Sequence, residues 1–172
     1  MRERPGWRSG RRVNPGKAHR GEGDKVSPFD IKSILLARHA QHVVLVHFPI
    51  ALFITAVAFD LLGHWRPTSA RAAAAYYNLL VAALSTIPVL ATGLLAWRWQ
   101  LEGARLHGNL LLHLVLGSLS SLLIWTIWWV HHQSRGRPDR VLPIQRLPVE
   151  LIAVALVALT GHLGGFLSGV NT

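Results

Sequence analysis

The sequence predicts an all-α integral membrane protein, a four-helix up-and-down bundle preceded by a disordered basic tail. The 172 residues are 51% hydrophobic and only 15% charged, and the apolar residues gather in four long segments. Each segment can cross about 30 Å of hydrocarbon at about 1.5 Å per helical residue. A chain in lipid must satisfy its own backbone hydrogen bonds, and these segments are too long and too uniformly apolar for barrel strands.

The expected helices cover about 43–63, 72–97, 108–130 and 147–170. Short connections between the first three predict antiparallel neighbours. Tryptophans lie near the ends of these three helices, as is typical of indole rings at the boundary between lipid and water. They are Trp65, Trp97, Trp99, Trp125, Trp128 and Trp129.

Residues 1–38 form the predicted tail, and residues 39–172 form the transmembrane domain. Ten of the 18 Lys and Arg residues lie in positions 1–40, which accounts for most of the formal net charge of +10. A segment rich in Arg, Gly and Pro buries too little apolar surface to fold. We expect it to be attracted to anionic lipid, without specific nucleic-acid binding. The positive-inside tendency favours two cytoplasmic termini.

The absence of Cys excludes a disulfide framework, a thiolate metal site, a cysteine nucleophile and haem attached through cysteines. An active site of the soluble type is not expected either. The chain is therefore more plausible as a membrane subunit than as an enzyme by itself.

Three histidines are the candidate ligands of a cofactor, because ionisable residues inside a membrane are costly and often functional. His47, His113 and His162 are expected at one depth, about 9–12 Å from the same interface. Such a layer could hold a b-type haem between two imidazoles or form a proton relay. No metal site is predicted, since Asp60 lies near the other end of the bundle and no membrane carboxylate lies in the histidine layer. The alternative is that the imidazoles only join helices by hydrogen bonds.

Other histidines are expected at the membrane surface. A second haem could use His64 with His131 or His132, but their charged, loop-like surroundings favour solvated side chains. His107, at the start of the third helix, could bind a phospholipid or quinone head group.

Helix four carries glycines at intervals of four, Gly161, Gly165 and Gly169, which permit close contact between helices. This ridge supports a different hypothesis, a non-catalytic scaffold that packs against other membrane or redox subunits or forms a homo-oligomer. Proton or cation transport ranks last, because no carboxylate pair is evident at the membrane centre.

Several short motifs together resemble a known family, the bacterial membrane proteins grouped as domain of unknown function 2231 (DUF2231). The resemblance covers about residues 42–171. The motifs are His47-Phe48-Pro49-Ile50-Ala51-Leu52, Asp60-Leu61-Leu62, Thr92-Gly93-Leu94-Leu95-Ala96-Trp97, His107-Gly108-Asn109-Leu110, Gly164-Gly165 and Gly169-Val170.

This resemblance implies a four-helix domain of the bacterial inner membrane without an established activity. Some members are joined to Rieske-type iron–sulfur modules, which favours an electron-transfer role, although this chain has no Cys. The family's motif positions correspond to His47, Pro49, Asp60, Gly93, His107, Asn109 and Gly165. His113 and His162 have no counterpart in that pattern. The resulting hypothesis is a subunit linked to haem b or quinone, with the scaffold as its alternative.

Overall fold

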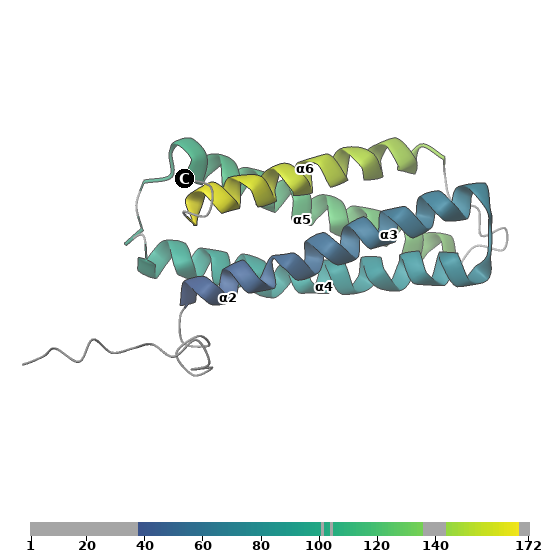
Figure 1. The fold of residues 1–172 in the computed structure, drawn as a ribbon, viewed down its shortest axis with the longest axis horizontal. Helices are drawn as coiled ribbons and strands as arrows, with labels where there is room; N and C mark the ends of the chain where they lie inside the picture. Colours follow the sequence, from purple (N-terminus) through teal and green to yellow (C-terminus); the bar gives the residue numbers. More distant parts are fainter. Residues whose placement is uncertain (1–37, 101, 104, 136–143, 169–172) are drawn as a thin grey trace, which may run out of the picture. The chain divides into compact units, whose positions relative to one another are not determined.

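The computed structural model describes residues 38–100, 102–103, 105–135 and 144–168 (Figure 1). Apart from Arg38, the predicted tail lies outside the described residues, as does the predicted end of the last helix at residue 170. The described residues form the helices α2 (Arg38–Leu45), α3 (His47–Trp65), α4 (Ser69–Gln100), α5 (Gly108–Arg135) and α6 (Arg146–Leu167).

These helices form the predicted up-and-down bundle, in which α3 packs along α4 and α5 packs along α6. Contacts between α4 and α5 join the two pairs, and α3 touches α6 over a shorter stretch. Four segments are long and apolar enough to span a membrane. They are Gln41–Trp65, Ser69–Trp99, Gly108–Arg135 and Arg146–Leu167.

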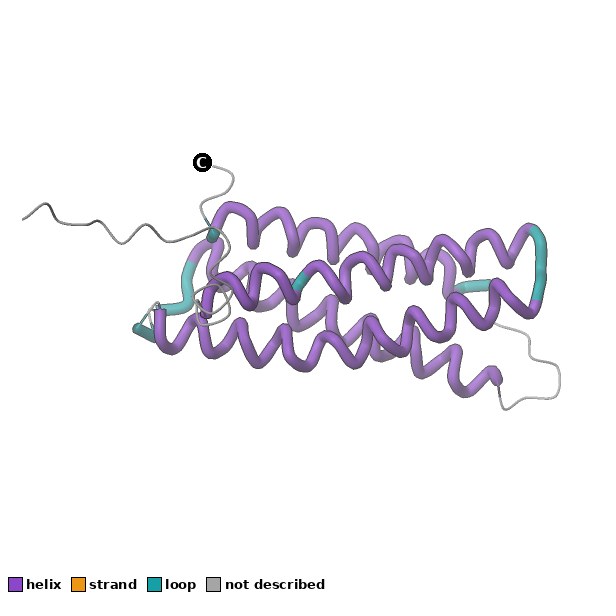
Figure 2. The backbone as a smooth tube through the Cα atoms, turned by 60° about the horizontal axis from the view of Figure 1, so that its bottom comes forward, coloured by secondary structure: helices purple, strands orange, loops and turns teal. Residues whose placement is uncertain are grey.

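The first span consists of two helices, α2 and α3, separated at Val46 (Figure 2). The cause is Pro49, which has no N–H to donate to the carbonyl of Leu45. Val46 keeps helical backbone angles, and its N–H still donates to the His42 carbonyl at 3.0 Å. The two helices therefore remain one membrane span despite the break.

Local interactions define both ends of α4. Thr68 precedes the helix, and its hydroxyl accepts a hydrogen bond from the backbone N–H of Arg71 at 3.3 Å, as an N-cap residue does. At the other end the Gly103 N–H donates to the Trp97 carbonyl at 3.2 Å, with φ of +66° at the glycine. The two residues are six positions apart, and a positive φ is a conformation that glycine adopts without steric cost.

Small and branched apolar side chains fill the interior of the bundle. Phe53, Leu79, Ile124 and Val157 are buried there, together with alanines that let the helices approach closely. The outer face carries many large exposed apolar side chains, Leu122 and Ile152 among them. A surface of this kind is stable in lipid rather than in water.

The third span extends further than its apolar run predicted. The expected end was near residue 130, but α5 continues to Arg135. The buried stripe of this helix, which includes Ile124 and Ile127, continues through His131 and Ser134. The helical spacing of the inward-facing residues therefore continues beyond the end of the apolar segment.

Phe53 and Phe48 provide a matched pair on α3, because Phe53 is fully buried and Phe48 is 57% exposed. Replacing Phe53 by Ala should lower the free energy of unfolding by about 2 kcal/mol. This is less than the about 3–5 kcal/mol typical of soluble cores, because lipid removes much of the transfer contribution and leaves the cavity contribution. Phe48→Ala should cost far less. Unfolding of the detergent-solubilised variants measures both, and equal losses would contradict the packing described above.

Candidate functional site

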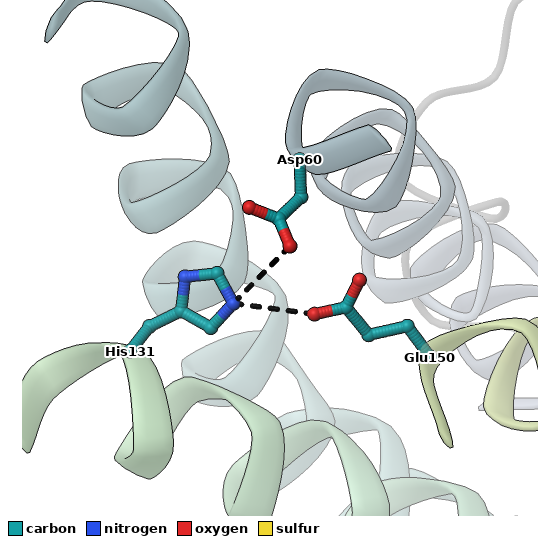
Figure 3. Close-up of side chains that lie close together, drawn as sticks. All are labelled: Asp60, His131 and Glu150. Carbon is teal, nitrogen blue, oxygen red and sulfur yellow. Dashed lines mark hydrogen bonds and ion pairs between the residues drawn. The ribbon is translucent and has the colours of Figure 1, made fainter. Parts of the chain in front are cut away.

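A cluster of ionisable side chains lies inside the bundle, at the end where α3 finishes and α6 begins. Asp60 comes from α3, His131 from α5, and Glu150 and Arg146 from α6. Figure 3 shows Asp60 and the Glu150 carboxylate converging on the His131 ring. At about 1.5 Å per residue, Asp60, His131 and Glu150 lie about 6–8 Å inside their helix ends, whereas Arg146 is the first residue of α6.

His131 and Arg146 supply the hydrogen-bond donors of this cluster. His131 Nε2 lies 3.2 Å from Glu150 Oε1 and 3.7 Å from Asp60 Oδ2. Both acceptors are carboxylate oxygens, so the ring carries its proton on Nε2. Arg146 Nε donates to Asp60 Oδ2 at 2.6 Å and lies 3.8 Å from Glu150 Oε1.

The cluster is almost completely enclosed. Glu150 is 1% exposed, His131 4% and Asp60 6%, while the Arg146 side chain is 11% exposed. Burial follows from helical spacing: Asp60 continues the inward stripe of Phe53, Ala56 and Val57 on α3. Glu150 precedes Ala153 and Val157 on the inward face of α6. The cluster therefore closes one end of the apolar core.

The charges of the cluster do not balance. Among the described residues, two carboxylates oppose one guanidinium in the cluster, which leaves a net charge of −1 when His131 is neutral. Glu150 Oε2 is buried and has no hydrogen-bond partner among the described residues. A buried charge without a partner is costly in a medium of low dielectric. One added positive charge would neutralise the cluster.

The positive charge that the cluster lacks could be supplied by a proton or by a metal ion, and these differ in the size of their charge. Donor atoms of Asp60, His131 and Glu150 lie within 4.8 Å of one another, a spacing that a metal could use. However, the Arg146 guanidinium already contacts Asp60, and a divalent cation beside it would be strongly repelled. With Arg146 in place, the arrangement favours a proton.

The three histidines predicted as a ligand layer have different surroundings. His47 is exposed, and its Nδ1 donates to the Val43 carbonyl at 2.7 Å. His162 is exposed and packs edge-on against Phe166. Only His113 points into the bundle, where its Nδ1 donates to the Thr160 carbonyl of α6 at 3.1 Å. None of these interactions joins two of the three rings.

The glycines of α6 contact neighbouring helices within the chain. A Cβ on Gly161 would lie 3.5 Å from Ile50 of α3, and one on Gly164 would lie 3.2 Å from the His113 ring. Gly164, which the predicted ridge omitted, therefore makes the tighter contact. Gly165 is part of the same helix, and Gly169 lies outside the described residues.

The expectation of solvated histidines was wrong for His131. The third helix was expected to end near residue 130, but α5 continues to Arg135. The additional turn places the His131 ring in the interior. His64, His107 and His132 are exposed, as expected of residues at the membrane surface. His42 of α2 makes an interhelical contact, because its Nδ1 lies 3.1 Å from Thr92 Oγ1 of α4.

Glu150 and Arg146 were not among the predicted site residues. A signal was present, because a basic and an acidic residue four positions apart open the fourth apolar segment. The inward stripe through Ile124, Ile127 and His131 was a second signal. Neither of these two signals shows which side chains of other helices will contact Glu150, Arg146 or His131.

The comparisons with known proteins concern the family. A family model described as "Predicted membrane protein (DUF2231)" matches residues 38–170. No significant match was found among curated proteins or among solved structures.

Arg146 should be the most sensitive position of the cluster. Arg146→Gln leaves two buried carboxylates without their cation and should lower the free energy of unfolding by about 3–5 kcal/mol. Adding Asp60→Asn should restore part of the loss, because the double variant contains a single buried carboxylate and returns to the wild-type net charge of −1. Detergent-to-SDS unfolding followed by tryptophan fluorescence measures these changes. Arg105→Gln, at an exposed position, is the control, and an equal loss there would contradict the assignment.

Proposed function

The chain belongs to the DUF2231 family of predicted membrane proteins, and because that description states no activity, we propose a function from the site: a membrane-embedded subunit that binds and releases one proton. The observation that carries the proposal is the buried, unpartnered Oε2 of Glu150 in a cluster of net charge −1. Ionisable side chains enclosed in membrane bundles are commonly parts of proton relays.

In this proposal the proton binds at Glu150 Oε2 and converts the carboxylate to the neutral acid. His131 donates to Oε1 of the same carboxylate and thereby directs Oε2 toward the proton. Arg146 compensates the charge of Asp60, so the two carboxylates differ in role. The cluster alternates between net charges of −1 and 0 as the proton leaves and returns.

The arrangement supports exchange with one side of the membrane rather than conduction through the bundle. Between the cluster and the polar contact of Ser120 with Thr160, the inward residues of α5 are Ile124 and Ile127. The buried Thr86 hydroxyl at this level is already bonded to Trp125 Nε1 and to the Ala83 carbonyl. That stretch is about 16 Å long at about 1.5 Å per residue. With both termini cytoplasmic, as we propose for a bacterial inner membrane, the cluster would exchange protons at the opposite face.

The redox and scaffold hypotheses have less support from the geometry. Gly117 packs against Thr160 and Gly161 packs against Ile50, so these small residues leave no gap for a haem. A haem or quinone role would instead use the exposed His47 or His162, with a second subunit supplying the other wall. A scaffold role would use exposed apolar faces, since Gly161 already contacts α3.

The proton proposal predicts an exchangeable carboxylic acid. Infrared difference spectra of the purified protein, titrated from acid to alkaline pH, should show loss of the C=O band of a protonated carboxyl group. The band should shift in heavy water and be absent in Glu150→Gln. Glu102→Gln is the matched control and should keep the band, since it removes an exposed carboxylate outside the cluster.

Two results would reject the proposal. A wild-type protein without an exchangeable acid band would exclude proton binding, and a band that persists in Glu150→Gln would exclude Glu150 as its site. Proteoliposomes supply an additional test, because a one-sided site should give no steady proton leak across the membrane.

The haem hypothesis has its own measurement. After expression with adequate haem supply, a dithionite-reduced minus oxidised spectrum of the purified protein should show an α-band if a b-type haem is bound. His47→Ala or His162→Ala should then reduce the band if the replaced histidine is an axial ligand. A spectrum without the band would exclude haem b.

A further inference from the structure

A column of aromatic and cationic side chains lies on the outer side of α4 and α5, outside the buried cluster. The Arg135 guanidinium lies 4.1 Å from the centre of the Tyr76 ring. The Tyr76 hydroxyl lies 3.0 Å from His132 Nδ1, and the His132 ring stacks on Trp128 with centres 5.3 Å apart. Arg135 and His132 are both exposed.

A shallow apolar groove adjoins this column. It has a volume of about 390 Å³ and is lined by Trp125, Thr126, Trp128 and Trp129 of α5. These residues precede Arg135, the last residue of the helix, by six to ten positions. The groove therefore lies about 9–15 Å deeper along the helix axis than Arg135. The same helix thus carries a cation at the membrane surface and, next to it, an apolar groove at the depth of the hydrocarbon.

The exposed charges beside the column have one sign. Asp60 and Glu150 are buried, whereas Arg66 and Arg135 are exposed among the described residues of this end. The column is thus complementary to an anion, and the groove is complementary to a hydrocarbon chain. An anionic phospholipid combines both properties.

We propose that this face binds an anionic phospholipid, with the phosphate on Arg135 and His132 and an acyl chain in the tryptophan groove. With the Tyr76 hydroxyl donating to Nδ1, the His132 proton lies on Nε2 and can be donated to a phosphate oxygen. Tyr76 holds the Arg135 guanidinium in place from below by a cation–π contact. The site is independent of the proton-binding function.

Native mass spectrometry of the purified protein tests this proposal with phosphatidylglycerol and phosphatidylcholine of identical acyl chains. The wild type should retain phosphatidylglycerol preferentially. Arg135→Gln should weaken phosphatidylglycerol binding about fivefold, the effect of one basic residue near a membrane surface. It should weaken phosphatidylcholine binding less, because the choline cation offsets the charge of the phosphate. Adding His132→Asn should weaken it further.

Arg105→Gln is the matched control, because Arg105 is also exposed but lies at the other end of α5. Unchanged phosphatidylglycerol binding in this variant supports a defined site. Equal binding of the two lipids by the wild type, or equal losses in the two arginine variants, would overturn the proposal. Trp129→Ala adds a test of the groove, and it should weaken binding of long-chain more than short-chain phosphatidylglycerol. An equal effect on both would exclude an acyl chain there.

Discussion

The ion pair between Asp60 and Arg146 is the constraint on which the arrangement of the bundle depends. It joins the end of α3 to the first turn of α6, two helices that otherwise touch over a short stretch. Because a buried carboxylate is costly without a cation, α6 must begin beside α3 and at the depth of Asp60. His131 of α5 enters the same cluster, so three helices are aligned at one end.

Hydrogen bonding and charge balance together separate the structural polar groups of the bundle from the group that we assign a function. His113 is satisfied by the Thr160 carbonyl, and His42 by Thr92. These contacts join neighbouring helices, as polar side chains do in membrane bundles. Two buried polar atoms lack a partner among the described residues, Trp128 Nε1 and Glu150 Oε2, and only Glu150 also carries a charge that is not balanced. A bound proton would therefore stabilise the bundle most at the Glu150 carboxylate, where both a hydrogen bond and a compensating charge are missing.

The sequence predicted the fold well because its governing constraint is local. Lipid requires each span to be apolar and helical, so the four segments were visible in the order of residues alone. Pro49 and Gly103 likewise act on their own helix ends. The helix end near residue 130 was predicted too early because hydrophobicity was taken as the boundary, whereas the inward stripe extends to Ser134. That difference moved His131 from a solvated loop into the interior.

The sequence by itself determined that this chain has four membrane spans, short connections and several ionisable groups inside them. It also predicted a similar depth for His47, His113 and His162, but depth does not specify the direction in which a side chain points. Only the tertiary structure decided that His47 and His162 face outward and that Asp60, His131, Arg146 and Glu150 meet. The physical reason is that rotation of each helix about its axis is set by packing against its neighbours, and that information is distributed over residues far apart in the chain.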